Sequence, residues 1–211
     1  MQKNPRAVTK PASRVRRTPE EAKRLILETA QALVARTGPQ GLRLQDIAAA
    51  AGISHPLILH HFGSRAGLMR ALTRKAAAEL KDRLVAAMTQ PEYTIGEQLD
   101  QVFDAFLGGL AQRLAWLLVE DPDGGPANNA MILREIADTL HARRVAAAAP
   151  GTVIARHDTE WLIHLVATSA FGEAMYGAQL RRSAGIAGGE ESARQFRAWF
   201  AALIRGHGPR R

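Results

Sequence analysis

Residues 43–65 hold the side chains of this chain that are best suited to binding DNA. Two arginines at the ends of the stretch can neutralise phosphates, and the polar residues between them can exchange hydrogen bonds with base edges. Two leucines in the same stretch are either ordinary surface residues or contacts to thymine methyl groups. The predicted DNA-contacting residues are Arg43, Ser54, His55, Leu57, Leu59, His60 and Arg65.

These side chains depend on two short helices joined by a tight turn, which the same stretch predicts. Apolar residues recur on one face of the first helix, and Gly52 after it can adopt the positive φ of a tight turn. Ser54 stands where an N-cap belongs, with Pro56 in the first turn of the second helix. A helix this short leaves one side free to enter a major groove. Residues 43–62 are therefore predicted to form a helix-turn-helix reader.

Metal binding and catalysis are not predicted, although three histidines lie close together. His55, His60 and His61 belong to a residue type that binds transition metals. His60 and His61 point in different directions on a helix, and no carboxylate stands four residues after any of the three. The chain also lacks cysteine, an HExxH motif, a nucleophile elbow and a glycine-rich phosphate loop after a strand. We therefore expect neither an enzyme nor a metal or other cofactor.

The composition is that of an ordinary globular chain with a basic balance. Its 211 residues are 46% hydrophobic and 23% charged, with a net charge of +8 and no cysteine. A chain without disulfides fits a reducing compartment, and its first residues lack the apolar core of a signal peptide. A cytoplasmic location is therefore expected. No uninterrupted apolar run approaches the roughly 20 residues of a membrane span, so no membrane partner is expected.

Most of the positive charge lies in the first 17 residues. Residues 1–17 contain six Lys or Arg side chains and no acid, which supplies +6 of the net charge of +8. Two prolines and the absence of apolar periodicity predict that this basic arm is disordered. The arm is either a solvated tail or a segment that lies along phosphates or in a minor groove and adds salt-dependent affinity.

Helical periodicity continues through the rest of the chain, and no strand pattern competes with it. The fold class is therefore predicted to be all-α. Thr18 and Glu21 form a capping box at the start of the first helix, which residues 38–41 end. Later helices are predicted at about residues 64–88, 94–119, 128–148, 157–182 and 190–205.

Two of these helices are predicted to form the interface of a homodimer. The helix at about 157–182 has no charged side, so it is expected to be buried all round, and it carries a face of small alanines. Close approach of a partner subunit explains that alanine face. The helix at about 190–205 has an apolar stripe that includes Phe196, Trp199 and Phe200. It can supply the other half of a four-helix interface.

At residues 18–72 the chain resembles the tetracycline-repressor (TetR) family of bacterial transcriptional regulators. The resemblance rests on the capped first helix, on QDIAAAAGIS, and on a helix that closes on HHFGSR and is followed by Leu68. Arg65 matches the family's basic residue at the start of the next helix, which implies a phosphate contact. The positions that depart from the family's common residues, and so bear on the operator sequence, are Arg43, His55, Pro56 and Leu59.

The resemblance also implies how the chain is divided and what it binds. It implies an N-terminal three-helix DNA-binding domain at 18–65 and a helical effector-binding and dimerisation domain at 66–211. The implied partners are a palindromic double-stranded operator and an unknown small-molecule effector. The candidate effector residues are Arg113, Trp116, Trp161 and His164. Arg113, with Trp116 near it on the helix, is either a snorkelling or ion-paired residue or a clamp for an acidic effector, and Trp161 and His164 either line a pocket or pack in the core.

The predicted function is a sequence-specific, DNA-binding transcriptional regulator. More specifically, we expect a ligand-responsive repressor that acts as a homodimer. The alternative is a sequence-tolerant architectural DNA-binding protein whose C-terminal half only dimerises, which the six basic residues of the arm motivate. The two hypotheses differ in whether specificity over random DNA persists as the salt concentration rises.

Overall fold

The computed structural model describes residues 18–206, except for residues 89, 91, 93, 121–129 and 187. The predicted basic arm, residues 1–17, therefore lies outside the described residues. The described part is helical and contains no strand, which confirms the all-α fold class. The elements are α1 (Pro19–Gly41), α2 (Leu44–Ala51), α3 (His55–Phe62), α4 (Arg65–Met88), α5 (Ile95–Ala105), the π-helical turn η1 (Phe106–Leu110), α6 (Ala111–Glu120), α7 (Ala130–Ala146), α8 (Arg156–Gly172), the π-helical turn η4 (Glu173–Gly177), α9 (Ala178–Ser183) and α10 (Glu190–Gly206).

Helix α1 starts as the sequence predicts. Thr18 Oγ1 accepts a hydrogen bond from the Glu21 backbone N–H at 3.2 Å, and the Glu21 carboxylate accepts one from the Thr18 N–H at 2.8 Å. The capping box thus satisfies two N–H groups that the helix itself leaves unpaired. At the other end Gly38 takes φ 71° and ψ 171°, so α1 is kinked there before a last turn that contains Pro39.

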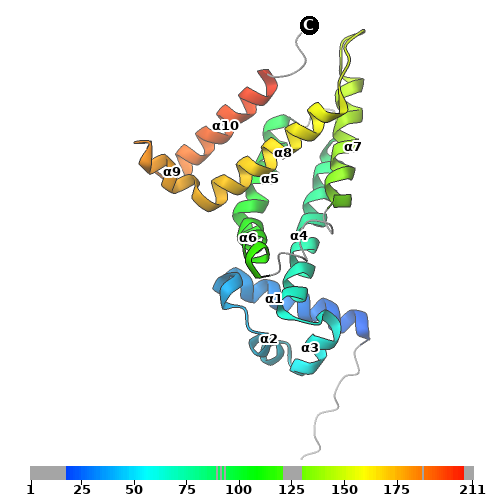
Figure 1. The fold of residues 1–211 in the computed structure, drawn as a ribbon, viewed down its shortest axis with the longest axis vertical. Helices are drawn as coiled ribbons and strands as arrows, with labels where there is room; N and C mark the ends of the chain where they lie inside the picture. The colour runs from blue at the N-terminus through cyan, green and yellow to red at the C-terminus, as the bar shows by residue number, and fades with distance from the viewer. Residues whose placement is uncertain are drawn as a thin grey trace, which may run out of the picture.

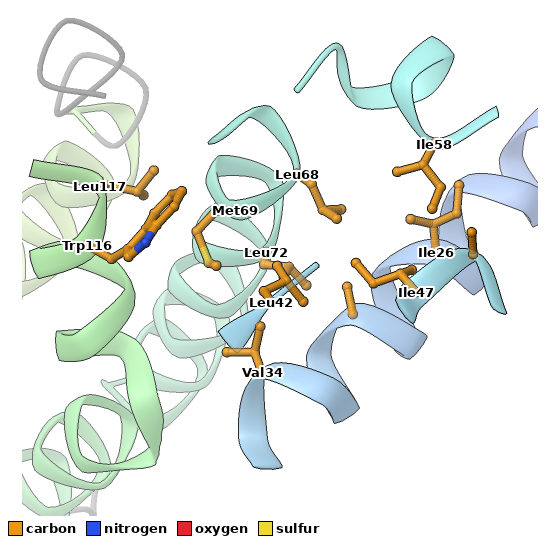
Figure 2. Close-up of a cluster of buried hydrophobic side chains, with 12 residues drawn as sticks. Ile26, Val34, Leu42, Ile47, Ile58, Leu68, Met69, Leu72, Trp116 and Leu117 are labelled. Atoms are coloured by element: carbon orange, nitrogen blue, oxygen red, sulfur yellow. The ribbon is translucent and has the colours of Figure 1, made fainter. Parts of the chain in front are cut away.

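Helices α1 to α3 and the first turns of α4 lie at one end of the molecule, far from α8 to α10 (Figure 1). They enclose a cluster of buried apolar side chains, which we call the N-terminal core (Figure 2). Figure 2 also shows that α6 reaches into this core with Trp116 and Leu117. Its buried members are Ile26, Ala30, Val34, Leu42, Ile47, Ala48, Ile58, Leu68, Met69, Leu72, Trp116 and Leu117.

A second buried cluster, the C-terminal core, is formed by the later turns of α4 with α5, α6, α7, α8 and α10. Phe103 is fully buried at its centre, with its ring 6.0 Å from those of Phe196 and Phe200 in edge-to-face geometry. Its buried members are Leu80, Leu84, Met88, Leu99, Phe103, Phe106, Leu110, Ala111, Ile136, Ala170, Phe200 and Ala201. Helices α4 and α6 therefore contribute to both cores, and α4 is the longer of the two (Figure 1).

The helix expected at about 94–119 is interrupted. Gly109 has φ 105° within the π-helical turn η1, which separates α5 from α6. A residue with a side chain rarely adopts that φ, so glycine is required here. The break lets α6 leave the direction of α5 and continue toward the N-terminal core, where Trp116 is buried. The glycine pair thus redirects the helix instead of merely bending it.

The helix expected at about 157–182 is divided in the structure into α8, η4 and α9. It is not buried all round in the single chain, contrary to expectation. Leu165, Tyr176 and Leu180 are exposed, and on α10 Trp199 is 60% exposed. The reason is that α8 packs on α5 and α7 with one side only. Large apolar side chains on its other side remain uncovered.

Among the described residues, one helical stretch is long and apolar enough to cross a membrane by length and composition. It is Ile95–Glu120, with a mean hydropathy of 1.4. The prediction based on uninterrupted apolar runs missed this stretch, because charged residues interrupt it. A core helix of a folded domain passes the same test, and here Leu99, Phe103 and Leu110 are buried in the C-terminal core.

Candidate functional site

The predicted reader folds around a glycine turn. Gly52 adopts the left-handed conformation, φ 63° and ψ 37°, and the N–H of Ile53 donates to the Ala48 carbonyl at 3.0 Å. Ile47 on α2 and Ile58 on α3 are both fully buried in the N-terminal core. Because apolar burial holds both helices from the inside, the outer side of α3 is left for a ligand. This is the helix-turn-helix arrangement that the sequence predicts.

Four of the seven predicted DNA-contacting residues are exposed. Arg43 precedes α2 and Ser54 precedes α3, while Leu59 and His60 lie on α3 itself. Ser54 occupies the N-cap position with an extended backbone, but its hydroxyl makes no capping hydrogen bond. Leu59 is 38% exposed, so its methyl groups are available for contact with a thymine methyl group. The remaining three residues, His55, Leu57 and Arg65, are half-buried.

Arg65 already has partners inside the protein. Its Nη2 donates to the carbonyls of Pro39 and Gln40 in the last turn of α1, at 2.9 Å each. Its guanidinium carbon lies 4.8 Å from the ring centroid of Trp116, a cation–π contact. One side chain thus connects the end of α1, the start of α4 and α6. We call Arg65 with Trp116 the inter-helix brace.

The four predicted effector residues do not form one site, although the rings of Trp161 and His164 lie 5.7 Å apart in edge-to-face geometry. Trp116 is 6% exposed and lies in the N-terminal core. Arg113 is also buried, at 8% exposed; burial lowers the pKa of its guanidinium, and the Glu79 carboxylate opposes that shift. Neither residue lines the large cavity of the structure. Trp161 lines that cavity, whereas His164 lines a smaller one between α7 and α8.

The large cavity has a volume of about 1280 Å³ and is walled by α4 from Arg70 onward, by α5 to α8 and by the end of α10. This volume exceeds the roughly 300–1,000 Å³ of typical ligand pockets. Its wall is mainly aliphatic and aromatic; examples are Leu80 and Leu84 on α4, Phe106 in η1, and Leu114 on α6. Such a wall can hold an apolar body by burial. The sequence did not identify the cavity, because it is assembled from helices that are distant along the chain.

Sequence reasoning also missed the inter-helix brace. Arg65 was assigned to DNA by its position in the motif, and Trp116 to the effector by its place near Arg113. The only local signal was a tryptophan on the apolar side of α6, which indicates burial but does not name the partner. A capping box at Thr94 and Glu97 was missed as well, although its spacing was visible in the sequence.

Comparisons with known proteins agree with this geometry. The family described as bacterial regulatory proteins, tetR family, matches residues 26–72. Over 54 residues the chain is 41% identical to the HTH-type transcriptional regulatory protein RaaS of Mycobacterium tuberculosis. That match spans 26% of this chain and 26% of the relative, so it concerns about a quarter of each protein.

The fold as a whole is similar to solved structures. A TetR-family transcriptional regulator from Pectobacterium atrosepticum has a TM-score of 0.67 at 20% identity, over 92% of this chain and 100% of that one. A TetR-family regulator from Mesorhizobium loti has a TM-score of 0.62 at 15% identity, over 90% and 96%. The multidrug binding protein EbrR has a TM-score of 0.52 at 21% identity, over 84% and 93%. The helix-turn-helix region, residues 26–72, thus matches the tetR family of bacterial regulatory proteins, and the fold of the chain is similar to that of solved TetR-family regulators.

Proposed function

We propose that this protein is a ligand-responsive transcriptional repressor that binds a palindromic operator as a homodimer. The observation that carries the proposal is α4, one uninterrupted helix that contributes to both ends of the molecule. Leu68, Met69 and Leu72 on its first turns are part of the N-terminal core. Leu80 and Leu84, further along, line the large cavity. A ligand that favours one position of α4 therefore also favours one position of the reader.

The DNA-binding part of the proposal rests on the exposed side of α3. Leu59 and His60 are exposed there, and the exposed residues Arg43 and Ser54 directly precede the two reader helices. We assign base contacts to α3 and phosphate contacts to Arg43 and to the basic residues before α1. Arg65 has a double assignment: its Nη2 donates to two carbonyls at the end of α1, and we assign it a phosphate contact as well.

The dimer part rests on the uncovered apolar residues of α8 to α10. Tyr176 in η4 and Leu180 on α9 are exposed, and Trp199 and Leu203 are exposed one turn apart on α10. Contiguous exposed apolar residues of this size are typical of interfaces. In a two-fold dimer the same residues of both subunits meet, which closes the assembly. Leu180→Glu with Trp199→Glu is expected to convert dimer to monomer in analytical ultracentrifugation, since both place charge on this surface.

The switching part follows from population arithmetic. An effector changes operator affinity only if it binds more tightly to the protein in one position of the reader than in the other. The cavity wall on α4 and the inter-helix brace between α4, α1 and α6 offer two routes by which such a difference reaches the reader. A ligand that fills the cavity without moving α4 or α6 is expected to leave DNA binding unchanged.

The decisive experiment is a titration against the DNA just upstream of the protein's own coding region. At about 150 mM salt, a repressor should prefer that fragment to a shuffled duplex by roughly a thousandfold, with two subunits per site. His60→Ala should relax that preference, because it removes a base contact. His157→Ala, an exposed histidine on α8, is the matched control and should bind normally.

Equal binding of both duplexes calls for wider genomic fragments. If no fragment is preferred, the sequence-tolerant architectural function replaces the repressor. In that case affinity should fall steeply with salt for every sequence alike, because only phosphate contacts carry it. This second function is favoured by the charge of residues 1–17 alone.

A further inference from the structure

Thr73 differs from three other threonines within the described helices. Thr37, Thr139 and Thr168 each donate to the carbonyl four residues earlier, at 2.9, 2.9 and 2.8 Å. That local bond is the usual way in which a helical threonine satisfies its hydroxyl. Thr73 is 2% exposed, and its Oγ1 has no hydrogen-bond partner among the described residues. A buried hydroxyl without a partner is costly, and Thr73 lines the large cavity.

Two arginines share this part of the cavity wall with Thr73. Arg70 and Arg74 lie three residues before and one residue after it on α4, and both line the cavity. The spacing of four residues between the arginines puts them on one side of the helix. Next to them the wall is apolar, with Ala77 and Leu80 on the following turn. One end of this mainly apolar cavity therefore carries a hydroxyl and two cationic side chains.

The charged side chains around the whole cavity are also mainly positive. The described residues that line it include four arginines and one carboxylate. Arg144, one of the four, donates to Thr159 Oγ1 at 2.7 Å, so it is partly committed within the protein. An anion entering the cavity meets hydrogen-bond donors that fit a carboxylate, whereas a cation meets repulsion. A molecule without a polar group would leave the Thr73 hydroxyl unpaired.

We propose that the cavity binds an amphipathic carboxylic acid, with its carboxylate held by the Thr73 hydroxyl together with Arg70 and Arg74 and its apolar body between α4 and α8. This inference rests on the proposed function, because it names the ligand class of the effector cavity. The apolar wall stabilises the body of the ligand by burial, and the three polar groups fix its direction. The carboxylate lies on α4 directly after Leu72, which belongs to the N-terminal core. Acid binding and reader position are thereby coupled on the same helix turn.

Three probes with the same alkyl chain test the headgroup. Dodecanoate, dodecanol and dodecylamine are titrated into the full-length protein by isothermal calorimetry, below the concentrations at which they form micelles. Dodecanoate is expected to bind at least tenfold more tightly than dodecanol, and dodecylamine more weakly than either. Equal affinity for dodecanoate and dodecanol overturns the proposal.

Two variants locate the contact. Thr73→Val keeps the shape of the side chain and removes the hydroxyl, and it should weaken dodecanoate about tenfold with little effect on dodecanol, since a hydrogen bond to a charged group is lost. Arg74→Gln should weaken dodecanoate severalfold. Arg83→Gln is the matched control, because Arg83 is an exposed arginine of α4 that does not line the cavity. An unchanged dodecanoate affinity in Thr73→Val, with the fold intact by circular dichroism, also overturns the proposal.

The operator assay separates this inference from the proposed function. If dodecanoate binds in a Thr73-dependent way but leaves operator affinity unchanged, the acid site stands and the ligand-responsive function fails for this class of ligand. If operator binding is specific and responds to another ligand, while dodecanoate shows no headgroup preference, the function stands and the acid site is wrong.

Discussion

The inter-helix brace predicts a measurable coupling energy between two residues that are far apart in the sequence. The guanidinium of Arg65 lies 4.8 Å from the ring centroid of Trp116, which is 6% exposed. A cation–π contact contributes about 0.5–1 kcal/mol at exposed sites and about 2 kcal/mol when it is desolvated. Arg65 is half-buried, so we expect a coupling of about 1–2 kcal/mol.

The perturbation is a double-mutant cycle with Arg65→Met and Trp116→Leu. Arg65→Met keeps the apolar stem but removes two charge-assisted hydrogen bonds to the Pro39 and Gln40 carbonyls. Because water can replace part of those bonds, the single variant should lose roughly 2–3 kcal/mol of unfolding free energy. Trp116→Leu removes buried area and the ring, and it should lose roughly 1–3 kcal/mol. The double variant should lose less than both together, by the coupling energy.

Urea unfolding followed by circular dichroism provides the free energies for all four proteins. The protein concentration is kept constant, because the apparent stability of an oligomer depends on it. As a control, Arg65→Met is combined with Leu99→Ala in the separate C-terminal core, where additivity within about 0.3–0.5 kcal/mol is expected. A coupling between Arg65 and Trp116 no larger than that control would refute the brace.

The remaining predictions concern two local features. Gly67→Ala should destabilise the protein by about 1–3 kcal/mol in thermal unfolding, because the new Cβ would lie 1.9 Å from the Phe62 carbonyl oxygen. Gly108→Ala, where a Cβ meets nothing within 4 Å, is its control and should be neutral or stabilising. Hydrogen bonds from Thr94 lower the pKa of Glu97, so this carboxylate stabilises the fold above its unfolded pKa and the contribution is lost as the pH falls through the native pKa. Thr94→Ala keeps the backbone donor but removes the hydroxyl, so it should raise the pKa of Glu97 in an NMR titration; an unchanged value would mean that the hydroxyl does not hold the carboxylate.

Much of the fold was predictable because it depends on local chemistry. A helix must satisfy its first N–H groups, so Thr18 with Glu21 marks the start of α1 in the sequence as in the structure. A tight turn needs a positive φ, so Gly52 marks the break between the reader helices. Each of these signals operates within a few residues. For the same reason α4 could be predicted as a long helix directly after the reader.

The candidate site was predictable where it lies on one element and not where it combines several. The exposed positions Leu59 and His60 follow from the periodicity of a single short helix. Arg113 and Trp116, by contrast, were predicted to contact an effector because they lie near each other on an apolar helix. Their surroundings depend on how α6 is redirected at Gly109, a change that periodicity does not reveal. Trp161 lies at the cavity for the equally non-local reason that α8 packs on α5 and α7.

The sequence by itself determined the helical class, the reader motif and the excess of positive charge, since residue type, spacing and capping act over one or two helical turns. Only the tertiary structure decided that Trp116 belongs beside Arg65, and that Thr73 has its unpaired hydroxyl at the cavity. Helical periodicity specifies which side of a helix is apolar, but it does not specify which other helix that side meets. That choice is made by packing among helices distant in the sequence, and it is their mutual arrangement that creates the cavity and the brace.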